Sequence, residues 1–115
     1  MKSLLLALFV MLIPLQSYAV GPDWLLGEWV MTFDPDGDTE DRLTFLKGGE
    51  FVTTETASGE KIKGMYSVKS DHIKVNLIYQ GKLFMKLKLT FDKVKDKLYY
   101  YSSETGNTAY YTKIK

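Results

Sequence analysis

A chain of 115 residues with a formal net charge of +1 is long enough for one hydrophobic core and too short for two. Its apolar content of 45% and aromatic content of 14% suffice for a small core that stands alone. The complete absence of cysteine excludes a disulfide framework and a leader that ends in a lipidated cysteine.

The amino terminus has the pattern of a secretory signal peptide. Lys2 supplies a positive charge, residues 4–15 form an apolar run broken only by Pro14, and Ser17 and Ala19 offer small side chains at the cleavage positions. The run is about half of the ~20 residues that a bilayer crossing needs, and no second run follows. We expect a signal peptide at 1–19 and a single domain at 20–115. The mature chain would have no integral membrane segment and would be periplasmic or secreted, by a bacterial route.

Beyond the leader, apolar residues recur with a period of two, which is typical of strands. The clearest case is 82–91, where leucines and Met85 alternate mostly with lysines, as in a half-buried antiparallel strand. The only helical candidate is a turn at 22–26. Turn residues separate the predicted strands, which in chain order are 27–33, 42–46, 50–56, 60–68, 72–79, 82–91, 97–102 and 107–114.

Short strands joined by short turns predict an all-β fold, a small antiparallel up-and-down β-barrel of about eight strands. Closure into a barrel is favoured because it leaves no open sheet edge. Large side chains would nearly fill such a barrel, so a ligand would be small or would lie at the open mouth. The side chains expected inside are Trp29, Met31, Phe33, Leu43, Phe45, Phe51, Ile62, Tyr66, Val68, Ile73, Val75, Leu77, Leu83, Met85, Leu87, Leu89 and Phe91.

Several segments resemble parts of lipocalin-type barrels. The sequence Trp24-Leu-Leu-Gly-Glu-Trp29 is similar to their G-x-W opening, and residues 43–51 and 64–73 are similar to segments of small bacterial lipocalin-like domains. The resemblance covers about the first half of the mature chain. It implies a calycin-type barrel with Trp29 closing one end, and it implies either a carrier of a hydrophobic molecule or an exported inhibitor or immunity protein.

The segment 34–41 is the most acidic part of the chain, with Asp34, Asp36, Asp38, Glu40 and Asp41. Its glycine stands fourth where a calcium-binding EF-hand loop requires it sixth, and the twelfth position lacks the required glutamate. We interpret the segment as a solvated hairpin loop with turn chemistry, with calcium chelation as the alternative. The same five carboxylates are the predicted partner-binding site.

No residue pattern indicates catalysis, a cofactor or a metal site. His72 is the only histidine, and no cysteine can join it as a ligand, so it is predicted to be a surface turn residue beside Asp71. No serine or threonine has a base and a surrounding motif that would make it a nucleophile. The chain is therefore predicted not to be an enzyme.

Aromatic side chains crowd the last two predicted strands. They occur on both faces of that hairpin, at Tyr99, Tyr100, Tyr101, Tyr110 and Tyr111. Cross-strand stacking explains such a pattern, and an exposed contact face for a protein or a sugar is the alternative.

Charge is divided between the two halves of the chain. Residues 20–60 hold ten acidic and two basic side chains, a net of −8, whereas residues 61–115 hold twelve lysines and four acidic side chains, a net of +8. A meander would turn the halves into an acidic and a basic flank. Outward positions on the basic flank are expected for Lys61, Lys63, Lys74, Lys86 and Lys88.

These observations leave two functions open. A neutral exported domain without arginine in its basic half is not expected to bind nucleic acid, but an anionic membrane surface or a charged protein would fit the basic flank. The first hypothesis is a non-enzymatic module that docks on another exported protein through its charged flank and residues 34–41. The alternative is a carrier of a small hydrophobic ligand, and the oligomeric state is left open.

Overall fold

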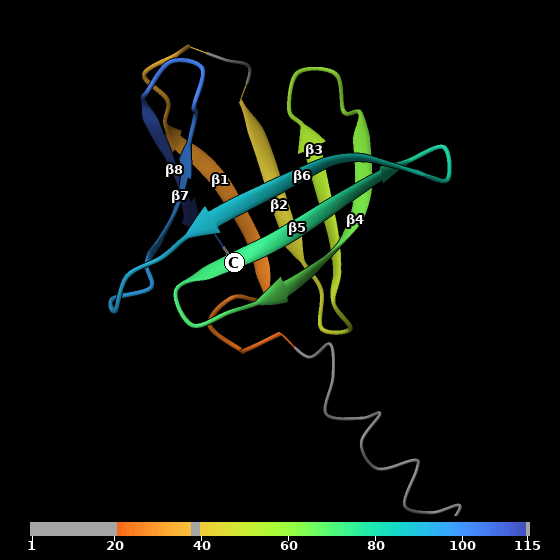
Figure 1. Ribbon diagram of the computed structural model, residues 1–115, viewed down its shortest axis with the longest axis horizontal. Coiled ribbons are helices and arrows are strands. Elements are labelled where there is room, and N and C mark those ends of the chain that lie inside the picture. Colours follow the sequence, from red (N-terminus) through yellow and green to blue (C-terminus); the bar gives the residue numbers. More distant parts are fainter. Residues whose placement is uncertain (1–20, 38–39, 115) are drawn as a thin grey trace, which may run out of the picture.

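The computed structural model describes residues 21–37 and 40–114, and its strands form one closed antiparallel barrel (Figure 1). Every strand pairs with its neighbours in sequence, and the last pairs with the first, which confirms the predicted up-and-down barrel. The architecture is compatible with a calycin-type fold. The strands are β1 (Gly27–Phe33), β2 (Asp41–Phe45), β3 (Glu50–Glu55), β4 (Lys61–Val68), β5 (His72–Tyr79), β6 (Lys82–Thr90), β7 (Lys97–Tyr101) and β8 (Thr108–Lys113).

The strand boundaries lie within one residue of the predicted ranges. The predicted signal peptide lies outside the described residues. At residues 22–26 the chain forms a hydrogen-bonded turn, in which the amides of Leu25 and Leu26 donate to the carbonyl of Pro22. In the described part of the chain, no helix has the length and hydropathy that crossing a bilayer requires.

One end of the barrel is filled by aromatic rings. Trp29 is fully buried there, and its indole Nε1 donates to the carbonyl oxygen of Leu25 at 2.9 Å. Phe45 packs against Phe51 and Tyr66, with ring centroids 5.0 and 5.1 Å away. Because the turn before β1 lies across this end, we refer to it as the closed end.

Most of the predicted core is confirmed, but three of its members are exposed. Met85 is 45% exposed because β6 pairs with β7 only at Thr90 and its first residues run past the wall of the barrel. Leu83 is 56% exposed because the register shift after Leu77 pairs it with Ile78 on the outer face. Phe33 is 48% exposed at a register shift near the end of β1. Buried residues that the periodicity did not predict are Leu25, Leu98, Ala109 and Tyr111.

A close backbone approach between β4 and β5 requires glycine at position 64. Gly64 lies between Phe51 of β3 and Leu77 of β5 in the sheet register. A Cβ atom at this position would meet the main-chain carbonyl oxygen of Asn76, which cannot move aside as a flexible side chain can. The absence of a side chain at this point therefore lets the two strands pack together.

Replacing Gly64 with alanine is expected to lower the free energy of unfolding by about 1–3 kcal/mol, the usual cost of overpacking. Gly48→Ala is the matched control, because a Cβ there would have no heavy atom within 4 Å. Chemical denaturation of both variants measures the difference. Equal stabilities would show that β4 and β5 separate at no cost.

Candidate functional site

The end of the barrel opposite the tryptophan contains a cavity of about 390 Å³. Apolar side chains from four strands form its floor, at Leu43, Ile62, Leu77, Leu87 and Leu89. This volume falls within the range of small-molecule pockets, roughly 300–1,000 Å³. The closed end is thus filled as predicted, whereas the open end is hollow.

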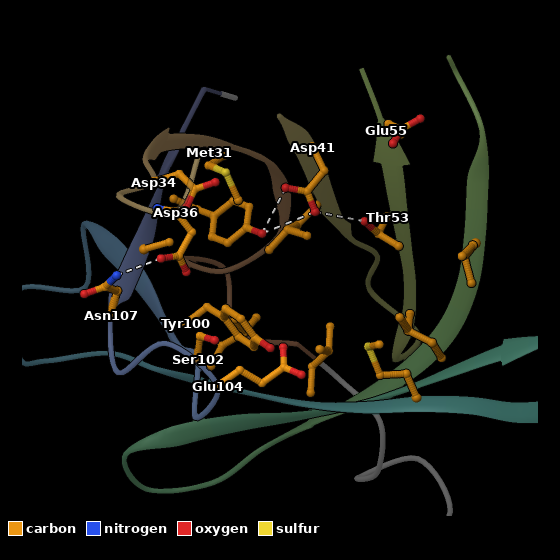
Figure 2. A pocket seen from close by; sticks show the side chains of 18 of the residues that line it. Met31, Asp34, Asp36, Asp41, Thr53, Glu55, Tyr100, Ser102, Glu104 and Asn107 are labelled. Carbon is orange, nitrogen blue, oxygen red and sulfur yellow. Dashed lines mark hydrogen bonds between the residues drawn. The ribbon is translucent and has the colours of Figure 1, made fainter. Parts of the chain in front are cut away.

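The rim of the cavity is acidic. Its carboxylates come from the β1–β2, β3–β4 and β7–β8 connections and the adjoining strand ends (Figure 2). Among the described residues that line the cavity, none is lysine or arginine. Negative charges around an apolar floor, which has a low dielectric constant, concentrate a negative electrostatic potential at the opening. The rim carboxylates are Asp34, Asp36, Asp41, Glu55, Glu60 and Glu104.

Asp41 is a rim carboxylate that is hydrogen-bonded to residues of the barrel wall. The hydroxyl of Tyr111 donates to its two oxygens at 3.0 and 3.2 Å, and Thr53 Oγ1 donates to Oδ2 at 3.4 Å (Figure 2). Burial raises the pKa of Asp41, and the hydrogen bonds from Tyr111 and Thr53 oppose that rise. Burial and the nearby charge of Asp41 raise the pKa of Tyr111, so its hydroxyl remains a donor at neutral pH.

Asp36 joins two connections at the rim. Its carboxylate accepts hydrogen bonds from Asn107 Nδ2 at 2.7 Å (Figure 2) and from Thr105 Oγ1 at 2.9 Å. Its amide donates to Asp34 Oδ1 at 3.1 Å. The β1–β2 connection is therefore fastened to the β7–β8 connection, which fixes one side of the opening.

The structure divides the five carboxylates that the sequence predicted as a partner-binding site. Asp34, Asp36 and Asp41 line the cavity, whereas Glu40 is exposed and does not line it. Asp38 lies outside the described residues. Sequence reasoning missed Glu55, Glu60 and Glu104, because only closure of the barrel brings these distant positions to one rim.

Other candidate residues lie away from the cavity. His72 stands at the start of β5, with Nδ1 2.8 Å from Asp71 Oδ1, and that hydrogen bond lowers the pKa of Asp71. Among residues 21–37 and 40–114, no three His, Cys, Asp or Glu side chains are grouped so as to hold a metal ion. Of the tyrosines, Tyr111 is buried and Tyr101 is 61% exposed.

Comparisons with protein families, with curated proteins and with solved structures found no match to this chain. The functional argument therefore rests on the cavity and the surface of this molecule.

Replacing Asp41 with asparagine is expected to make stability less dependent on pH. Because burial raises the pKa of Asp41, the folded state holds its proton more tightly than the unfolded chain does. The resulting penalty is fully present above the raised pKa and disappears as pH falls below the ordinary value of 3.8. Asp41→Asn should therefore raise the free energy of unfolding at neutral pH and not in acid.

Denaturation of Asp41→Asn at several pH values measures this difference, with Glu40→Gln as an exposed control that should show none. A loss of stability at neutral pH would mean that the hydrogen bonds from Tyr111 and Thr53 outweigh the cost of burying the charge.

Proposed function

We propose that the chain is an exported, non-enzymatic, lipocalin-like binding domain that holds a small molecule in the open end of its barrel. The cavity of about 390 Å³ is the observation that supports this proposal most strongly. Its apolar floor would take up the apolar body of a ligand, and its position at the mouth gives access from solvent. Apolar cavities with a few polar groups at the opening are typical of small-molecule sites.

The charge of the rim favours ligands with one kind of polar end over another. In the described part of the chain, six carboxylates line the opening and no lysine or arginine does. An anionic ligand would meet charges of its own sign, whereas a hydroxyl or ammonium group could donate to the carboxylates. The preferred ligand therefore has an apolar body and a neutral or cationic polar end.

Docking on another exported protein through residues 34–41, as an inhibitor or immunity protein, becomes the second hypothesis. Three carboxylates of that segment line the cavity, and Asp36 is hydrogen-bonded within the rim. The exposed Glu40 still offers a contact for such a partner.

Calorimetric titration of the chain with three decyl compounds tests the proposal. Decanol and decylammonium are expected to bind, and decanoate to bind more weakly because the rim repels it. Leu87→Trp should weaken binding by at least about tenfold, since an indole would occupy the floor of the cavity. Lys88→Trp is the matched control, because its exposed side chain lies on the outer face of the same strand. Equal affinities of the two variants would place any bound ligand outside the barrel.

The preference for a cation is tested separately at the rim. Glu55→Gln combined with Glu104→Gln should lower the affinity for decylammonium by about two- to fivefold, the effect of losing solvent-accessible charge pairs. The affinity for decanol should stay unchanged, and this comparison serves as the internal control. A parallel loss for both compounds would indicate a change in the shape of the cavity instead.

A further inference from the structure

Apolar side chains are exposed on both faces of the β5–β6 hairpin tip. Ile78 of β5 and Leu83 of β6 are cross-strand partners on the outer face and are 42% and 56% exposed. Tyr79 follows Ile78 and so points the other way, where its ring lies 5.9 Å from that of Phe84. Tyr79 and Phe84 are 45% and 54% exposed.

The hairpin extends past the barrel, and for this reason both faces of its tip are uncovered. Over residues 82–89, β6 is paired with β5 alone, and its pairing with β7 begins only at Thr90. The turn at 80–81 therefore projects away from the other connections (Figure 1). A projecting hairpin with apolar side chains exposed on both faces is unusual in a protein surrounded by water. Such exposed apolar surface usually marks a site that contacts a membrane or a partner molecule.

Lysines without an ion pair lie along the strands behind the tip. Residues 61–90 contain seven lysines and a single carboxylate, Asp71, which lies beyond the far end of β5 from the tip. Lys74 and Lys88 are direct cross-strand partners, an arrangement of like charges that destabilises a sheet by itself. In the described part of the chain, none of these seven lysines forms an ion pair. An anionic surface would supply the missing countercharge.

We propose that the β5–β6 hairpin docks on the surface of a bilayer that contains anionic lipids. The apolar tip would lie among the headgroups and upper acyl chains, and Lys82 and Lys86, the lysines of the hairpin nearest the turn, would contact lipid phosphates. Lys74 and Lys88 lie further back and would add longer-range attraction. A lipid surface is favoured over a protein because lipid surrounds an inserted tip on both faces, whereas a protein partner usually covers one. Tyrosine also suits the boundary between headgroups and acyl chains.

The geometry limits how deeply the tip would insert. A strand rises about 3.3 Å per residue, so the distance from Ile78 to the turn at Gly81 corresponds to about 10 Å. This matches the depth of the boundary between headgroups and acyl chains, about 5–10 Å. Deeper insertion is disfavoured because the edge of β6 that faces away from β5 would carry unpaired backbone groups into hydrocarbon.

A fluorescent label at the tip tests the proposal and is independent of ligand binding in the cavity. The chain has no cysteine, so Gln80→Cys accepts an environment-sensitive fluorophore at one position. Val94→Cys is the control, because Val94 is 72% exposed in the β6–β7 connection at the closed end. The label reports on one position only. This is needed because the apolar run at 4–15 of the full chain would also bind vesicles, independently of the hairpin.

On vesicles of phosphatidylglycerol and phosphatidylcholine, emission from position 80 should shift to the blue and emission from position 94 should not. Pure phosphatidylcholine vesicles should give a much weaker response. Equal shifts at both positions would overturn the proposal, since another segment would then be responsible. The absence of any shift at position 80 would overturn it as well.

Charge variants test the role of the lysines. Lys82→Gln with Lys86→Gln should reduce partitioning onto the anionic vesicles by at least about tenfold, since each lysine near such a surface accounts for about a fivefold effect. Lys47→Gln with Lys93→Gln makes the same change of net charge at exposed positions elsewhere and should have a much smaller effect. Equal losses would show that net charge alone drives adsorption, which would contradict docking through the hairpin.

Discussion

The pairing of β8 with β1 is the constraint on which the rest of the structure depends, because it converts a linear meander into a ring with an inside. Met31 of β1 lies opposite Tyr111 of β8 in this pairing. Closure carries the Tyr111 hydroxyl to Asp41 on β2, although the two residues are 70 positions apart in sequence. It also brings the β7–β8 connection to Asp36, so the same pairing assembles the rim of the cavity.

The ring is filled at one end and hollow at the other. Large aromatic side chains, led by Trp29 and Phe45, occupy the closed end, whereas aliphatic side chains such as Leu43 and Leu89 leave space at the open end. The filled half buries apolar surface that stabilises a barrel without disulfides. The hollow half is then free to hold a ligand, and its carboxylates can select the polar end of that ligand.

The sequence predicts the strands and their order well because period-two alternation and turn residues are local signals. It fails where the outcome depends on neighbours that are distant in the chain. Alternation places Leu83 and Met85 on the face of the barrel interior, but it cannot show that a register shift pairs Leu83 with the outward-facing Ile78, or that β7 is absent beside Met85. In the same way, residues 34–41 are recognisable as acidic, whereas their grouping with Glu55 and Glu104 depends on barrel closure.

The most direct test of the central claim, that the open end of the barrel holds a small ligand, is to follow leucine methyl signals by NMR during a titration with decylammonium. The account predicts shifts for Leu43, Leu77 and Leu89, which line the cavity, and none for Leu25 or Leu98, which are buried but do not line it. Shifts confined to the exposed Leu46 and Leu83, with the cavity leucines unchanged, would contradict it.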